Sequence, residues 1–118
     1  MLINFKMEND KGIMEYSVFG KWKDGYLVFM DKHIPNTVYQ IKISSERICI
    51  KRCGNISMNL EFVKHKKIKG DYQNKEGIML DIASYTKLLS ISDDGFFLEY
   101  DFFVSDEYQT TNKLSIKY

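Results

Sequence analysis

Alanine and proline are scarce in this sequence: Ala83 and Pro35 are the single representatives of their types among 118 residues. Alanine is the strongest helix former, so its near-absence argues against a helical domain. The chain instead carries 13 Ile, 8 Phe and 8 Tyr residues, which suit the pleated surface of a sheet. The composition therefore predicts an all-β protein. A chain of 118 residues has room for one domain, residues 1–118, with one hydrophobic core.

The chain also lacks an excess of charge of either sign. Its 17 basic and 16 acidic residues give a formal charge of +1, which excludes the overall positive charge of a dedicated nucleic-acid binder. The charges are unevenly placed: residues 42–75 carry nine basic and three acidic side chains, whereas residues 76–118 carry three and eight. Such a distribution either pairs basic and acidic strands as neighbours or presents two poles to a partner.

Long apolar runs are missing as well. No uncharged stretch approaches the roughly 18 residues that a transmembrane helix needs, and the first residues show no signal-peptide pattern, so we expect a cytoplasmic protein without a membrane partner. Cys49 and Cys53 fall on one expected strand, where four residues span about 13 Å, beyond the roughly 7 Å limit for a disulfide. Both are therefore expected to be reduced thiols.

Alternation of apolar and polar residues recurs along the whole chain and predicts about ten short strands separated by turn residues such as Asp24-Gly25 and Asp93–Gly95. Short turns without crossover helices make an antiparallel meander. Closure of such a sheet removes its exposed edges. We therefore predict a single antiparallel up-and-down β-barrel of about 8–10 strands, whose interior is either filled by side chains or holds one small ligand.

Patterns that carry catalysis or metal binding are scarce. His33 and His65 are the only histidines, and neither has a second ligand at the spacing of a metal site. The chain has no nucleophile elbow and no phosphate-binding glycine loop. We predict a protein that is not an enzyme and has no metal or cofactor. The alternative is a site assembled from carboxylates on distant strands.

Arg52 is the most informative single residue. It has the same parity as Ile48 and Ile50, so it points into the barrel if they do. Its permanent charge needs partners there, and the expected inward polar groups are the hydroxyls of Tyr72 and Tyr100. Arg52 either lies near a barrel mouth, bonded to tyrosine and backbone oxygens, or it receives the anionic group of a ligand.

Trp22 is a further candidate for the interior, where an aromatic side chain either lines a ligand cavity or fills it. The predicted ligand site in the barrel interior thus comprises Arg52, Tyr72, Tyr100 and Trp22. Our leading hypothesis is a non-enzymatic protein that binds a small, partly apolar or anionic molecule.

A basic segment offers a function of another class. Residues 64–69 place five basic side chains in six positions, which indicates either a surface that binds phosphates or a solvated hairpin tip. The 15 Lys against 2 Arg disfavour forked phosphate contacts and argue against a nucleic-acid partner. The alternative function is a protein- or RNA-interaction module that uses Lys64, Lys66, Lys67 and Lys69. Self-association as a homodimer is left open.

The order of several short motifs resembles a known family. The segment Asp24–Asp31, the step Arg52-Cys53-Gly54 and the strand Gly95–Asp101 are similar to the YwiB-like family of small bacterial proteins of unknown function. The resemblance covers about residues 13–118 and implies a calycin or lipocalin-like β-barrel in the bacterial cytoplasm. It implies no activity. Where the family tends to have Tyr-x-Glu, this chain has Phe29-Met30-Asp31; if those family positions bind a ligand, this chain would hold it differently or not at all.

Overall fold

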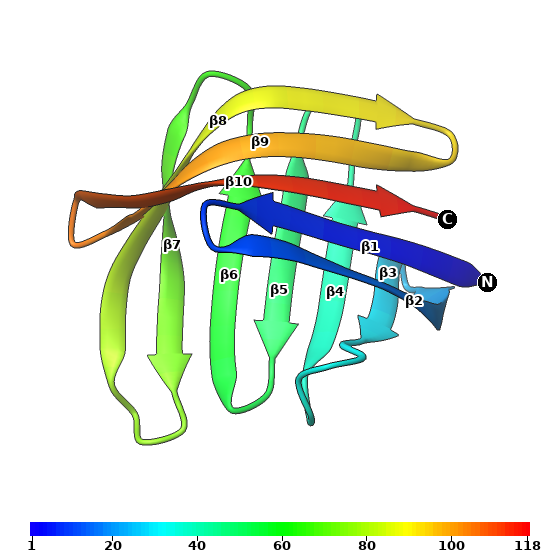
Figure 1. Cartoon of the computed structure of the whole chain (residues 1–118), viewed down its shortest axis with the longest axis horizontal. Coiled ribbons are helices and arrows are strands. Elements are labelled where there is room, and N and C mark those ends of the chain that lie inside the picture. Colours follow the sequence, from blue (N-terminus) through cyan, green and yellow to red (C-terminus); the bar gives the residue numbers. More distant parts are fainter.

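The structure, a computed structural model, describes residues 1–118 and contains ten β-strands and no helix. The strands are β1 (Leu2–Asn9), β2 (Gly12–Lys23), β3 (Tyr26–Met30), β4 (Val38–Ile43), β5 (Ile48–Cys53), β6 (Ile56–Phe62), β7 (Lys67–Asn74), β8 (Met79–Ser92), β9 (Gly95–Val104) and β10 (Glu107–Lys117). Each strand pairs antiparallel with its neighbours along the chain, and β1 also pairs with β10, so the sheet closes into a barrel (Figure 1). The predicted single up-and-down barrel is confirmed. The chain forms no helix that could cross a membrane.

The hairpin between β2 and β3 shows how local sequence sets the turns. Asp24 and Gly25 have φ angles of 52° and 83°, the left-handed values that a two-residue primed turn requires. This turn places Lys23 opposite Tyr26. The Asp-Gly signal in the sequence is therefore sufficient to explain the register of this hairpin.

Strand β8 departs from simple alternation. Its pairing with β9 shifts register between Thr86 and Leu88, which is the mark of a β-bulge. Thr86 is buried, whereas Leu88 is 47% exposed and Leu89 packs against the core. The bulge therefore moves the inward positions of β8 from even to odd numbers.

The inner face of the barrel holds the hydrophobic core. Its cluster of 15 buried residues alternates along the strands with exposed positions, as sheet geometry requires. Aromatic rings dominate one side, where Phe5 stacks on Tyr16 with 4.6 Å between ring centroids and Phe29 stacks on Tyr39 at 5.2 Å. The core members are Ile3, Phe5, Tyr16, Leu27, Phe29, Ile41, Ile48, Leu60, Phe62, Ile82, Phe96, Leu98, Tyr100, Leu114 and Ile116.

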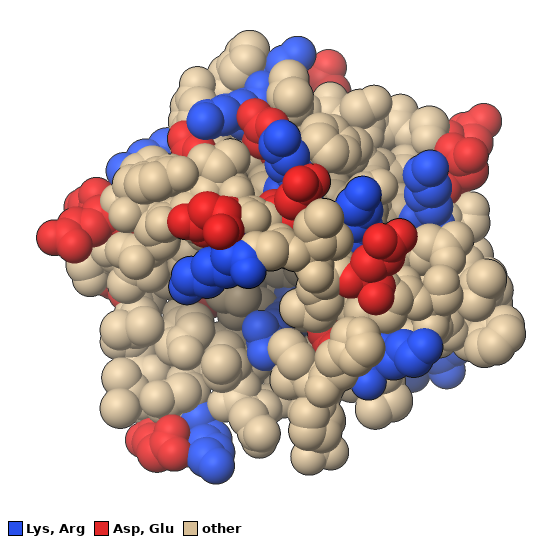
Figure 2. All heavy atoms as spheres, in the orientation of Figure 1, with Lys and Arg blue, Asp and Glu red and all other residues tan.

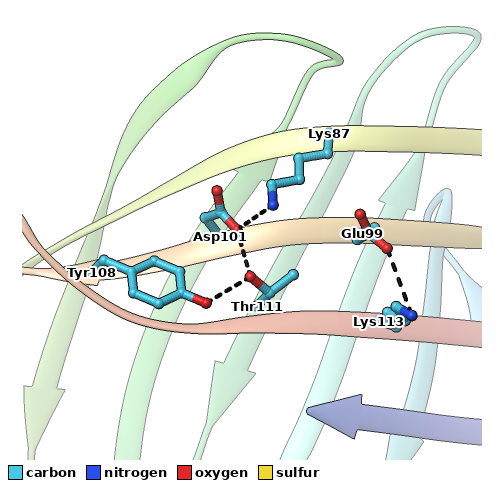
Figure 3. Close-up of polar contacts among 6 residues, drawn as sticks. All are labelled: Lys87, Glu99, Asp101, Tyr108, Thr111 and Lys113. Carbon is cyan, nitrogen blue, oxygen red and sulfur yellow. Dashed lines mark hydrogen bonds and ion pairs between the residues drawn. The ribbon is translucent and has the colours of Figure 1, made fainter. Parts of the chain in front are cut away.

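Polar contacts join β8, β9 and β10 on the outer face of the barrel (Figure 3). Asp101 lies 3.1 Å from Nζ of Lys87 and accepts a hydrogen bond of 2.6 Å from Thr111. The hydroxyls of Tyr108 and Thr111 lie 2.8 Å apart. Contacts between such exposed groups add little to stability, and they lie on the face that is turned away from the core.

The uneven charge distribution is only slightly compensated within the chain. Of the four ion pairs, one joins the basic residues 42–75 to the acidic residues 76–118, with Nζ of Lys67 3.7 Å from Asp106. The other three stay within one of the two regions, as Arg47 with Glu61 does. Pairing between neighbouring strands therefore explains little of the separation of charge.

Candidate functional site

A cavity of about 170 Å³ lies inside the barrel, toward the end where β5 finishes. Of the 14 residues that line it, 12 are hydrophobic, and the two exceptions are Arg52 and Asn112. In Figure 2 the surface is hollowed near the middle of the view, below the strands β10 and β1, and basic atoms are visible in the hollow. The interior is thus mostly filled by side chains but keeps a space of ligand size. Its lining consists of Phe5, Met7, Tyr39, Ile41, Ile50, Arg52, Met58, Leu60, Phe62, Tyr100, Phe102, Asn112, Leu114 and Ile116.

Arg52 is the only charged residue of the cavity lining. On β5 it lies opposite Tyr39 of β4 and Met58 of β6. Its Nε atom is buried without a hydrogen-bond partner, and its side chain takes part in none of the four ion pairs. Leaving a buried donor unpaired costs about 1–3 kcal/mol. Arg52 therefore brings a permanent charge and an unused hydrogen-bond donor to the wall of the cavity.

A buried carboxylate lies close to the same end of the barrel. Asp31, the first residue after β3, is only 8% exposed. Its Oδ2 accepts hydrogen bonds from the hydroxyls of Tyr16 and Tyr39, at 3.3 and 3.2 Å. Its Oδ1 accepts from the backbone N–H groups of His33 and Ile34, at 2.8 and 2.9 Å. Asp31 thus ties the loop after β3 to the tyrosines beneath it.

The charges of Arg52 and Asp31 both affect the pKa of Tyr39. Burial raises the pKa of Tyr39 to about 12; the guanidinium of Arg52 opposes this shift and the carboxylate of Asp31 adds to it. Burial in the same cluster, with the charge of Asp31, also raises the pKa of Tyr16. At neutral pH these phenols therefore keep their protons and act as hydrogen-bond donors.

Tyr100 and Asn112 form a second polar pair in the cavity. They lie opposite each other on β9 and β10. Burial raises the pKa of Tyr100 to about 12, and the neighbouring side-chain amide of Asn112 partly offsets the rise. The Oδ1 atom of Asn112 accepts a hydrogen bond of 3.0 Å from Asn9 Nδ2, which fixes the orientation of the amide.

Two of the four predicted interior residues line the cavity and two do not. Arg52 and Tyr100 are in the lining. Tyr72 packs against the core from β7 without reaching the cavity. Trp22 is 46% exposed, and its ring meets that of Tyr118 edge-on at 5.3 Å.

Trp22 does not line the cavity, for a topological reason. Its parity places it on the inward side of β2, but it is the last inward residue before the Asp24-Gly25 turn. Since β2 and β5 run in opposite directions, the ends of these strands lie at opposite ends of the barrel. Trp22 therefore lies at the opposite end of the barrel from Arg52.

Sequence reasoning missed three residues of the site: Asp31, Tyr39 and Asn112. Tyr39 was detectable only through the register that pairs it with Arg52. Asp31 offered a weak signal, because an Asp at the start of a loop often accepts hydrogen bonds from the backbone two residues on. Asn112 lies in a polar stretch of β10, where nothing in the local pattern marks it.

The basic segment 64–69 lies on the surface, in the β6–β7 connection and the start of β7, and all four of its lysines are exposed. Lys67 forms an ion pair with Asp106 and a cation–π contact with Phe103, whose ring centroid is 4.2 Å from Nζ. Lys64, Lys66 and Lys69 form no ion pair.

No three His, Cys, Asp or Glu side chains come together as metal ligands would.

The fold and the cavity define a small, closed β-barrel with one charged side chain in the lining of a mostly apolar cavity. The chain belongs to the family described as Domain of unknown function (DUF1934), whose model matches residues 3–116. The crystal structure of the ywiB protein from Bacillus subtilis has the same fold, with a TM-score of 0.66 and 17% sequence identity over 98% of this chain and 87% of that one. The resemblance to the YwiB-like family is thereby confirmed. No curated protein matches the chain.

Proposed function

We propose that this protein is a non-enzymatic binder of one small, partly apolar, anionic molecule, which occupies the interior cavity with its charged group on Arg52. The observation that carries the proposal is the buried, unpartnered Nε of Arg52 in a cavity otherwise lined by hydrophobic residues and Asn112. An anionic oxygen would satisfy this donor through a charge-assisted hydrogen bond, which is about twice as strong as a neutral one.

The size of the cavity limits the ligand. Its volume of about 170 Å³ is close to the 150 Å³ of an engineered apolar cavity that binds benzene. A body of about six carbon atoms therefore fits beside Arg52. Because one arginine is the only charge of the lining, a single negative charge is the best match.

The polar residues of the cavity favour binding over catalysis. Besides Arg52, its titratable groups are Tyr39 and Tyr100, whose pKa values are both raised to about 12. A general acid or base works best with a pKa near the operating pH. We therefore assign these phenols to orienting the ligand as hydrogen-bond donors.

The proposal is tested with benzoate and hexanoate as probes and hexanol as the uncharged control. We expect a dissociation constant on the order of 100 μM for a well-fitting probe of this size. At 100 times that concentration, ligand binding adds about 2.7 kcal/mol to the free energy of unfolding, or roughly 10 °C in Tm. Isothermal titration calorimetry supplies the stoichiometry, expected to be one.

The two arginines of the chain provide a matched pair of variants. Arg52→Gln should abolish stabilisation by both acids, whereas Arg47→Gln should leave it unchanged, because Arg47 lies outside the cavity and pairs with Glu61. Absence of binding by wild type, or equal effects of the two substitutions, would refute the proposal.

A second candidate function uses the basic segment 64–69 to bind an acidic protein or RNA. The exposure of Lys64, Lys66 and Lys69, none of them in an ion pair, favours it. The test is salt-dependent retention on heparin or RNA, which should vanish when these three lysines and Lys67 become Glu. If the wild type appears in the flow-through at low salt, this second candidate function is refuted.

A cytoplasmic location is part of the proposal. Cys49 and Cys53 are both free and partly buried, which suits a compartment that keeps thiols reduced. Burial and the neighbouring carboxylate of Glu61 raise the pKa of Cys49, so its unreactive thiol form predominates at neutral pH.

A further inference from the structure

An apolar row crosses the outer face of three neighbouring strands, where a closed barrel would be expected to carry polar residues. We call Leu2, Phe19 and Met30 the apolar row; they are 49%, 81% and 58% exposed. Leu2 pairs with Phe19 across β1 and β2, and Gly20 pairs with Phe29, which brings Phe19 opposite Met30 of β3. Figure 1 shows β1 and β2 side by side along one wall of the barrel. Adjacent exposed apolar side chains of this kind are typical of interaction surfaces.

A shallow hollow lies directly beside Phe19. It has a volume of about 300 Å³ and is lined by Phe19, Gly20, Lys21, Val28, Phe29 and Met30. The hollow lies among the outward side chains of Phe19 and Lys21 on β2 and of Val28 and Met30 on β3. The protruding ring and the hollow are thus adjacent on the same surface. A two-fold symmetric contact requires this self-complementarity, because each copy presents the same patch to the other.

Two opposite charges on the outer face of β2 lie equally far from Phe19, whereas Lys21 on the same face has no acidic counterpart at Ser17. Glu15 precedes Phe19 by four residues and Lys23 follows it by four, and both point outward and are exposed. Neither forms an ion pair within the chain. Each lies about 13 Å from Phe19 along the strand. A second β2 strand laid antiparallel across Phe19 would therefore place each Glu15 opposite the Lys23 of the other copy.

We propose that the protein forms a two-fold symmetric homodimer in which the β2 strands of two copies pack face to face and antiparallel. The two Phe19 rings meet at the two-fold axis, each beside the hollow of the other copy, and the Glu15 and Lys23 side chains pair at both ends. The patch extends over about eight residues and three strands, or roughly 400 Å² per copy. This is about half of the standard interface, so we expect a dissociation constant on the order of 100 μM. The dimer is independent of the interior site.

Sedimentation equilibrium over a concentration range that spans this value tests the proposal. Phe19→Asp should raise the dissociation constant at least about tenfold, because a central aromatic contact is lost. Met79→Asp is the matched control, since Met79 is 71% exposed on β8, away from the apolar row; it should leave dimerisation unchanged. A wild-type protein that stays monomeric throughout, or a Phe19→Asp variant that dimerises like wild type, would overturn the proposal.

Charge reversal tests the antiparallel arrangement separately. Glu15→Lys or Lys23→Glu alone should weaken the dimer about fivefold, since symmetry places each change at two contacts. The double variant Glu15→Lys/Lys23→Glu should restore the wild-type dissociation constant. Both residues are exposed, so folding is not at risk. A double variant as weak as the single ones, or single variants as strong as wild type, would refute this arrangement.

Discussion

Replacing Arg52 by methionine should make the ligand-free protein more stable. A charged side chain whose buried Nε has no partner lowers the stability of the folded state, because that donor is bonded to water when the chain is unfolded. Methionine has a similar length and suits the apolar walls formed by residues such as Ile50 and Met58. The substitution removes the unpaired donor without leaving a large void.

The size of the expected stability gain follows from the burial of the Arg52 side chain. An unpaired buried donor costs about 1–3 kcal/mol. Because Arg52 as a whole is only half-buried, water still reaches part of the guanidinium, and we expect the lower end, about 1 kcal/mol. For a domain of this size that gain raises Tm by roughly 4 °C.

Urea unfolding and calorimetry of wild type, Arg52→Met and Arg47→Met measure the effect. The Arg47 variant should stay within about 1 kcal/mol of wild type, because the Arg47–Glu61 pair lies on the surface. A loss of about 2 kcal/mol or more in Arg52→Met would refute the reasoning. That result would mean that Arg52 is a structural residue bonded to tyrosine or backbone oxygens, which is the other alternative that the sequence leaves open.

Three further predictions concern the surroundings of the cavity. Asp31→Asn should lower the free energy of unfolding by about 1–2 kcal/mol in urea titrations, since an amide nitrogen at Oδ2 cannot accept the two tyrosine hydrogen bonds. The raised pKa values of Tyr39 and Tyr100, about 12 against 10.0 in the unfolded chain, mean that the unfolded state loses these protons first. Stability should therefore be unaffected by these groups below pH 10 and should fall between pH 10 and 12; tyrosinate absorbance of folded and unfolded protein measures the difference, and identical titrations would contradict it. Gly54→Ala should cost about 2 kcal/mol in thermal unfolding, because Gly54 has a φ of 155° and an added Cβ would collide with the backbone oxygen of Asn36; an unchanged Tm would contradict this.

The fold could be predicted from the sequence because the patterns that determine the strands and turns are local. Alternation identifies strands, and turn residues such as Asp24-Gly25 identify hairpins, so a meander and its closure follow without knowledge of distant contacts. The bulge in β8 was not accessible, because the shift between Thr86 and Leu88 depends on how β9 pairs with both halves of a long strand. Parity therefore indicated the inward residues except where a bulge resets it.

The candidate site could be predicted only in part. Parity tells which face of a strand a residue occupies, but not where the residue lies along the barrel axis. Arg52 and Trp22 share an inward parity yet lie at opposite ends, since their strands run in opposite directions. The polar neighbours of Arg52 depend on register: Tyr39 lies opposite it only because β4 and β5 pair as they do. Asp31 joins the cluster through a loop that folds back on two tyrosines.

Side-chain NMR of the two arginines tests the central claim most directly. The Nε–H group of Arg52 should move downfield and saturate as benzoate is added, because it gains a charged acceptor. The Nε–H signal of Arg47, identified from the Arg47→Gln variant, should stay in place. An Arg52 signal that does not respond, or one that moves in parallel with that of Arg47, would contradict a ligand site built on Arg52.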